Sequence, residues 1–134
     1  MDALIVELPD KRGELARLAD AIAQQGINIT GCCGATAGAA GAIVLMTDND
    51  ARARGVLDEA GYRVRKVELV SIWVSDRPGG LAEAARRLDD AGVNIEALIP
   101  TRTLGGNVEV AFATDNPGRA RSALGDGVLA APRG

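Results

Sequence analysis

Two copies of a short polar loop carry the groups in this sequence that are best suited to bind a small charged molecule. In each copy an aspartate is followed three residues later by a glycine, as Asp10 to Gly13 and as Asp76 to Gly79. A carboxylate accepts hydrogen bonds from an ammonium group, and glycine lets the backbone approach a ligand closely. Where such a loop leads into a helix, free N–H groups and the helix dipole favour a bound carboxylate. This chemistry would suit a zwitterion such as a free amino acid.

An asparagine follows each loop at a matching distance, Asn28 in the first copy and Asn94 in the second. Its amide offers both a donor and an acceptor, and it begins a predicted strand. The candidate ligand-binding residues are therefore Asp10, Gly13, Asn28, Asp76, Gly79, Gly80 and Asn94. Each residue type has a purely structural alternative, because aspartate caps helix starts, glycine ends helices and asparagine ties down turns.

The composition excludes several classes of function. The chain of 134 residues has no histidine, which removes the Ser-His-Asp and Cys-His nucleophile pairs and the zincin motif. One Trp, one Tyr and one Phe cannot form a stacking platform for nucleic acid, and a net charge of -3 offers no basic patch. We expect no catalytic residue, no metal site, no cofactor and no nucleic-acid partner.

The cysteines and the N-terminal residues indicate the cellular compartment of the protein. Cys32 and Cys33 are adjacent, which suits neither a C-x-x-C redox pair nor a zinc site, so we interpret them as two small apolar residues on a strand. The second residue of the sequence is acidic, and no apolar run reaches about 18 residues. These features predict a soluble cytoplasmic protein with no membrane contact.

The two loops belong to an internal repeat. When the sequence is shifted by 66 residues, eight of the 21 pairs from positions 10 to 30 are identical. Chance would give roughly two in a composition so rich in Ala and Gly. Farther on, residues 47–49 match residues 114–116 at an offset of 67. Two homologous units therefore fill the chain.

Each unit has the pattern strand, helix, strand, strand, helix, strand. Residues 3–8 and 70–75 are short apolar runs that end at turn residues. The helix after each loop has apolar residues at i, i+3, i+4 and i+7, which predicts a buried face. These residues are Leu15, Leu18, Ala19 and Ile22 in the first unit, and Leu81, Ala84, Ala85 and Leu88 in the second.

Particular residue types mark the helix ends. Gly26 and Gly92 are placed to end these helices in the left-handed conformation. Asn49 and Asn116 are good N-caps for a second helix, and Pro117 suits the first turn of that helix.

The predicted fold class is α+β. We expect two ferredoxin-like βαββαβ units, residues 1–69 and 70–134, each with a four-stranded antiparallel sheet and two helices on one face, packed side by side. Residues 62–75 lack a turn signal, so the last strand of the first unit should run directly into the second unit. The last strand of the second unit is degraded, because only residues 128–130 remain before Pro132, and its edge invites a partner. The glycine-rich segment 31–41 predicts a flexible hairpin.

The paired Asp-x-x-Gly-x-Leu loops, each followed by Gly-Ile/Val-Asn-Ile, resemble a tandem ACT domain over nearly the whole chain. The resemblance implies a regulatory module that binds an amino acid between units packed side by side and adjusts a linked enzyme or regulator. Serine-sensing ACT domains have a histidine two residues before the polar loop residue, whereas this chain has Leu8 and Val74 there. A serine sensor of that type is therefore not expected.

The functional prediction is a non-enzymatic regulatory protein that binds a free amino acid and forms a homodimer, with a metabolic enzyme as a possible partner. One alternative is a subunit of an amino-acid biosynthetic enzyme that binds no small molecule and pairs through sheet edges. A second alternative is a small enzyme with acyl-phosphate chemistry on the same scaffold, but the sequence lacks a phosphate-binding motif.

Overall fold

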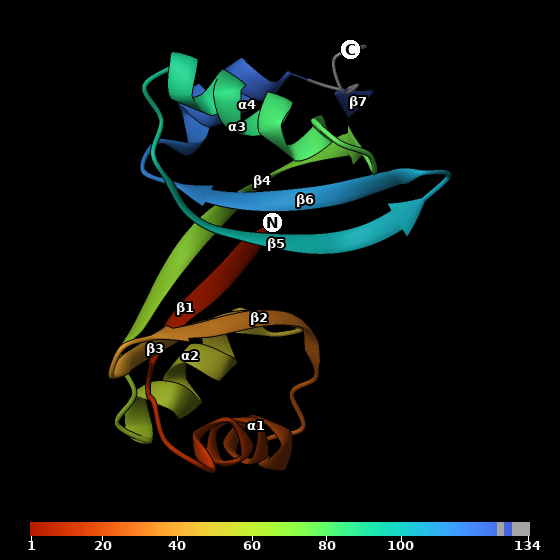
Figure 1. The fold of residues 1–134 in the computed structure, drawn as a ribbon. Helices are drawn as coiled ribbons and strands as arrows, with labels where there is room; N and C mark the ends of the chain where they lie inside the picture. Colours follow the sequence, from red (N-terminus) through yellow and green to blue (C-terminus); the bar gives the residue numbers. More distant parts are fainter. Residues whose placement is uncertain (126–127, 130–134) are drawn as a thin grey trace. The chain divides into compact units, whose positions relative to one another are not determined.

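The chain folds into two compact units with the same order of elements. The computed structural model describes residues 1–125 and 128–129. The N-terminal unit comprises Asp2–Val67, and the C-terminal unit begins at Glu68 and also holds Met1. Figure 1 shows the elements, which are β1 (Asp2–Pro9), α1 (Glu14–Gln24), β2 (Ile29–Ala37), β3 (Ala40–Thr47), α2 (Asp50–Glu59), β4 (Val64–Ser75), α3 (Gly80–Asp90), β5 (Ile95–Leu104), β6 (Asn107–Thr114), α4 (Pro117–Leu124) and β7 (Val128–Leu129). Strand β4 is continuous across the boundary between the units, which confirms the prediction for residues 62–75.

The N-terminal unit has a sheet with the strand order β2-β3-β1-β4, in which β1 and β2 each pair antiparallel with β3. Leu4 of β1 and Cys32 of β2 both lie opposite Leu45 of β3. Strand β4 is the neighbour of β1 in the sheet, and just before β4 begins the Arg63 carbonyl oxygen accepts the Glu7 N–H at 3.1 Å. Helices α1 and α2 pack on one face of this sheet. The core between helices and sheet includes Leu4, Val6, Leu18, Ile22, Leu45 and Leu57.

The C-terminal unit repeats this architecture with the strand order β5-β6-β4, again with antiparallel pairs. Phe112 of β6 lies opposite Val70 of β4 and Leu98 of β5, and it is fully buried beneath the helices. Helices α3 and α4 lie on one face of the sheet (Figure 1). The core includes Val70, Ile72, Ala84, Leu88, Phe112 and Leu124. The α+β class and the ferredoxin-like element order are therefore confirmed. The prediction of a separate four-stranded sheet in each unit is wrong, because the long strand β4 is shared and the strands form one sheet with the order β2-β3-β1-β4-β6-β5.

The last strand of the C-terminal unit differs from the prediction. Val128 and Leu129 form β7, which pairs parallel to β4 opposite Trp73 and Val74. The prediction of a wholly antiparallel sheet is therefore wrong for this strand. The edge of β4 has backbone groups that can pair with a short strand of either direction, and sequence patterns do not encode that choice. Residues 130 and 132, which also entered the prediction of a degraded strand, lie outside the described residues.

The helix ends follow the local signals in the sequence. Gly26 and Gly92 have φ of 71° and 72°, the left-handed conformation that was predicted. The side chain of Asn49 accepts from the Arg52 N–H at 3.2 Å. Asn116 caps α4 in the same way, and Pro117 begins that helix. These four helix ends therefore form as their residue types predict.

Two local predictions need revision. Leu15 and Leu81 were placed in buried helix stripes, but they are 55% and 47% exposed. The periodicity identifies the buried face, yet these two residues lie in the first turn, beyond the edge of the core. The segment 31–41 is a hairpin as predicted, but β2 and β3 extend so far that only residues 38 and 39 form its turn.

Candidate functional site

The two repeated loops have the same backbone geometry. In the N-terminal unit the Lys11 N–H donates to the Pro9 carbonyl oxygen at 2.9 Å. In the C-terminal unit the Arg77 N–H donates to the Ser75 carbonyl oxygen at the same distance. Each loop then enters a helix through a glycine. The sequence repeat is therefore also a repeat of local structure.

These entry glycines occupy a conformation that other residues rarely adopt. Gly13 and Gly79 are the residues before α1 and α3, with φ of 86° and 91°. Among the described residues no side chain caps either helix, whereas asparagines cap α2 and α4. The Glu14 and Gly80 N–H groups donate to the Lys11 and Arg77 carbonyl oxygens at 3.5 and 3.1 Å. The N–H groups left for a ligand are therefore those of the second and third residues of α1 and α3, where the positive end of each helix dipole faces its loop.

A pocket lies at each loop. The pocket of the N-terminal unit has a volume of about 340 Å³ and that of the C-terminal unit about 520 Å³. Their linings coincide under the sequence repeat, since they contain the matching pairs Leu8 and Val74, Asp10 and Asp76, Lys11 and Arg77, Leu15 and Leu81, Cys32 and Leu98, and Ile43 and Val110. The two units thus present equivalent hollows, each bordered by an aspartate, a cationic side chain and an apolar wall.

The loop aspartates are available for a ligand. Asp10 and Asp76 are exposed and line their pockets. Within residues 1–125, neither carboxylate makes a hydrogen bond or an ion pair, and neither caps the helix that follows. The structural alternative of an aspartate N-cap is therefore not what this conformation shows.

The two loops differ at the first position of the helix. In the N-terminal unit this is Glu14, whose carboxylate is 9% exposed and lies 3.5 Å from the Lys11 ammonium and 3.4 Å from the Arg17 guanidinium. In the C-terminal unit it is Gly80, where an added Cβ would lie 2.1 Å from the Ser75 carbonyl oxygen. The missing side chain at Gly80 therefore serves close packing of the loop on its own strand.

Asn28 and Asn94 lie at the other end of their sheets. Asn28 precedes Ile29, which pairs with Thr47, while Asp10 follows Pro9, which pairs with Ala40. Seven residues of β3 separate these two positions, or roughly 23 Å at 3.3 Å per residue. The structure therefore does not bring Asn28 to Asp10 within a unit, and the same register separates Asn94 from Asp76.

Both asparagines have a structural role through their backbones. The Asn28 N–H donates to the Asp48 carboxylate at 3.0 Å, and the Asp48 N–H donates back to the Asn28 carbonyl oxygen. Asn94 and Asp115 repeat this pair with a distance of 2.9 Å for the first bond. These bonds use no side-chain atom of the asparagines, so their amides stay exposed for other contacts.

Sequence reasoning missed several residues that line the loop pockets. Leu15 and Leu81 were assigned to the core, and Cys32 was interpreted only as a strand residue. Cys32 and Cys33 are in fact both free thiols and both exposed on β2. The sequence repeat could have identified these pocket residues, because Cys32 of β2 and Leu98 of β5 occupy matching positions in the two units.

A carboxylate with a lowered pKa occurs elsewhere, at Glu109 on β6. The Arg102 guanidinium donates to its carboxylate from Nε at 3.2 Å and from Nη2 at 3.0 Å, and the Thr101 hydroxyl donates at 2.6 Å. These hydrogen bonds lower the pKa of Glu109. Arg102 also lies 5.3 Å from the centroid of the Trp73 ring. Because the Glu109 carboxylate is fully paired, we interpret the cluster as a structural part of the sheet and not as a reactive centre.

Neither metal binding nor a membrane span is indicated by the part of the chain that the structure describes. In residues 1–125 and 128–129, no three His, Cys, Asp or Glu side chains group in a way that could hold a metal ion. No helix among the same residues is long and apolar enough to cross a bilayer.

The fold and the repeated loops define a tandem of ACT-like domains. A family model described as an ACT domain pair matches residues 1–129, and the chain belongs to this family. This confirms the resemblance found in the sequence. No curated protein matches the chain.

Solved structures show the same fold. Protein BT0572 from Bacteroides thetaiotaomicron is similar at 23% identity and a TM-score of 0.74, over 92% of this chain and 85% of that one. The regulatory subunit of aspartate kinase from Thermus thermophilus, in its ligand-free form, is similar at 20% identity and a TM-score of 0.63, over 92% and 87%. The corresponding subunit from Thermus flavus is similar at 18% identity and a TM-score of 0.64, over 92% and 90%.

Proposed function

We propose that this chain is a non-enzymatic regulatory protein that binds a free amino acid at its two loop pockets. The observation that carries the proposal is the repetition of the whole arrangement, because both units place an unpaired aspartate and an uncapped helix start at one pocket. In this proposal the second and third N–H groups of α1 and α3, which follow Gly13 and Gly79, receive the ligand carboxylate. Asp10 and Asp76 accept hydrogen bonds from its ammonium group.

The side chain of the amino acid would be selected by the apolar walls. In the N-terminal pocket these include Leu15, Cys32 and Ile43, and in the C-terminal pocket Leu81 and Leu98. The N-terminal pocket is also lined by the Glu14 carboxylate, whereas the matching residue of the C-terminal unit is Gly80. The two pockets are therefore expected to differ in affinity or in preferred ligand.

Regulation then requires only that the ligand bind one conformation of the protein in preference to another. Membership of the ACT family and the similarity to regulatory subunits of aspartate kinase support an output on a metabolic enzyme or regulator. We expect a homodimer in the cytoplasm, where the exposed thiols of Cys32 and Cys33 would stay reduced.

A thermal-shift screen of the common amino acids tests the proposal. At 100 times its Kd a ligand adds about 2.7 kcal/mol to the free energy of unfolding, which for a chain of this size raises Tm by roughly 8 °C. At least one amino acid should produce such a shift. The proposal fails if no amino acid does so.

Variants locate the response. Asp10→Ala and Asp76→Ala should abolish it at their own pockets, while Asp20→Ala and Asp89→Ala, which remove the same charge from exposed helix positions, should preserve it. Asn94→Ala keeps both backbone hydrogen bonds to Asp115, so it should leave the fold intact. If Asn94→Ala also loses the response, its side chain belongs to a ligand site.

A second candidate function is a subunit that binds no small molecule and acts only through a protein partner. The similarity to regulatory subunits of aspartate kinase favours it. A flat amino-acid screen together with stable co-elution of a biosynthetic enzyme would support this alternative over the amino-acid sensor.

A further inference from the structure

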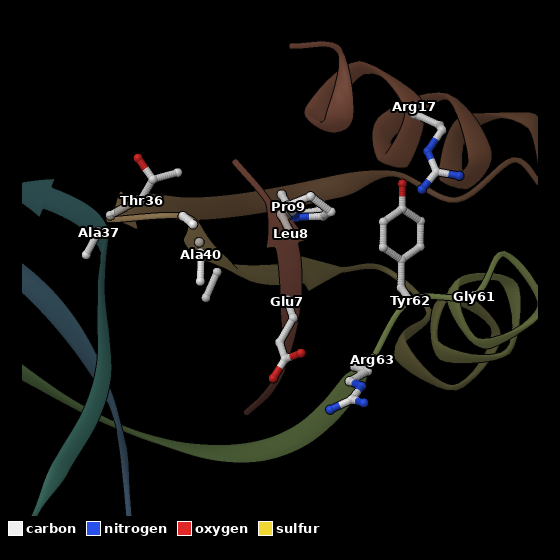
Figure 2. A pocket seen from close by; sticks show the side chains of 14 residues that line it. Glu7, Leu8, Pro9, Arg17, Thr36, Ala37, Ala40, Gly61, Tyr62 and Arg63 are labelled. Carbon is white, nitrogen blue, oxygen red and sulfur yellow. The ribbon is translucent and has the colours of Figure 1, made fainter. Parts of the chain in front are cut away.

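A second hollow in the N-terminal unit has a volume of about 800 Å³ and adjoins the loop pocket. It lies between β1, the β2–β3 hairpin and the residues that lead into β4 (Figure 2). It shares Leu8 and Pro9 of β1 and four residues of the hairpin, Ala35, Thr36, Gly41 and Ala42, with the loop pocket. Its polar groups are different, however, since they come from Glu7, Arg17, Tyr62 and Arg63.

Tyr62 is the first observation that points to a ligand. Its side chain is 8% exposed, and within the described residues its hydroxyl oxygen is buried with no hydrogen-bond partner. A phenylalanine would fill the same space without that unpaired group, so a buried hydroxyl of this kind calls for an explanation. A ligand acceptor in the pocket would satisfy it.

The hydrogen-bond donors around Tyr62 indicate the kind of ligand. The Arg17 guanidinium carbon lies 4.8 Å from the centroid of the Tyr62 ring, and Figure 2 shows it beside the hydroxyl end. Arg63 and Glu7 line the same pocket, and the Arg17 guanidinium also lies 3.4 Å from the Glu14 carboxylate. The guanidinium N–H groups and the phenolic donor favour an anionic head group, because a guanidinium binds a carboxylate in bidentate fashion.

The rest of the lining is apolar and made of small residues. Ala37 and Ala40 of the hairpin lie across from Leu8 and Pro9 of β1 (Figure 2). This wall offers contact area for hydrocarbon and no further hydrogen-bonding side chain except Thr36. A short aliphatic tail suits such a wall.

The same polar set does not recur in the sequence of the C-terminal half. At an offset of 66 the residue that matches Arg17 is Glu83, which reverses the charge. The residue that matches Tyr62 is Val128, or Leu129 at an offset of 67, and neither has a hydroxyl. The pocket chemistry is therefore particular to the N-terminal unit.

We propose that this pocket binds a small aliphatic carboxylate, with the carboxylate on Arg17 and the Tyr62 hydroxyl and the tail against the hairpin alanines. This site adjoins the N-terminal amino-acid pocket and shares part of its wall, but its two binding groups, Arg17 and Tyr62, do not line that pocket. It would give the N-terminal unit a second input.

Fluorine NMR gives a direct test, because Tyr62 and Trp73 are the only tyrosine and the only tryptophan in the chain. The protein labelled with 3-fluorotyrosine and 5-fluorotryptophan gives one signal in each unit. Titration with sodium hexanoate at constant ionic strength should shift the Tyr62 signal in a saturable way and leave the Trp73 signal unchanged. Hexanamide, which has the same tail without the charge, should shift neither signal.

Calorimetric titration of hexanoate with variants completes the test. Tyr62→Phe and Arg17→Gln should each weaken binding by about tenfold or more, since each removes a hydrogen bond to a charged group. Arg54→Gln, an equal charge change at an exposed position of α2, should bind as the parent does. The proposal is overturned if the Tyr62 signal does not saturate, if hexanamide shifts it equally, or if both pocket variants bind hexanoate as tightly as the parent protein.

Discussion

Replacement of Gly80 by alanine is the most demanding test of how the C-terminal loop is built. An alanine Cβ would lie 2.1 Å from the Ser75 carbonyl oxygen and 3.1 Å from the carbonyl carbon. Ordinary contact begins near 3.4 Å, so the backbone of Ser75 has to move by more than an ångström. That backbone also accepts the Arg77 N–H at 2.9 Å and ends the pairing of β4 with Asn107.

The expected cost follows from these contacts. Overpacking a tight site costs about 1–3 kcal/mol, and loss of the Arg77 hydrogen bond adds about 1 kcal/mol. Gly80→Ala should therefore lower the free energy of unfolding of the C-terminal unit by roughly 2–4 kcal/mol. Because the displaced residues border Asp76, it should also abolish any ligand response of that pocket.

Gly55→Ala provides the matched control. Gly55 lies inside α2, and an added Cβ there meets nothing within 4 Å. Alanine at a helix interior is more stable than glycine by about 0.5–1 kcal/mol, so this variant should gain stability. Urea unfolding followed by Trp73 fluorescence reports on the C-terminal unit, and Tyr62 reports on the N-terminal unit. A Gly80→Ala protein as stable as the parent would refute the proposed packing of the loop on Ser75.

Three further predictions concern single side chains. Asn49→Ala and Asn116→Ala should each lower the free energy of unfolding by about 1 kcal/mol in urea titrations, since each removes a helix cap, and no loss would show that the caps are not formed. Tyr62→Phe without ligand should leave stability unchanged or raise it, because it deletes an unpaired buried hydroxyl, and a loss above about 1 kcal/mol would reveal a partner inside the fold. Glu109→Gln should be less stable than the parent at pH 7, because the Arg102 hydrogen bond lowers the pKa of Glu109 and stabilises the ionised form. That difference should narrow as the pH falls below the ordinary glutamate pKa of about 4.3 and through the lowered value, and a difference independent of pH would contradict it.

The elements that sequence analysis predicted correctly are those with local causes. Gly26 and Gly92 end their helices because only a residue without a side chain adopts that backbone conformation easily. Asn49 and Asn116 cap helices through a bond that spans three residues. The sequence repeat then extended these local predictions to the fold of the whole chain, because two homologous units share one architecture.

The errors and omissions arise from long-range structure. The apolar spacing of Leu15 and Leu81 resembles that of core residues, but whether a first turn is covered depends on how far the sheet extends beneath it. The direction of β7 depends on which backbone groups of β4 remain unpaired, and sequence patterns contain no record of this. Tyr62 carried no motif at all, and its significance comes only from the burial of its hydroxyl beside Arg17.

A backbone amide NMR titration tests the central claim most directly. The amino acid selected by the thermal-shift screen is added to ¹⁵N-labelled protein, and the shifts are followed residue by residue. The account predicts that the largest saturable shifts fall on the helix starts, at residues 14–16 and 80–82, and that Asp10→Ala and Asp76→Ala each remove the shifts of their own unit. Saturable binding whose shifts avoid both helix starts would contradict the account.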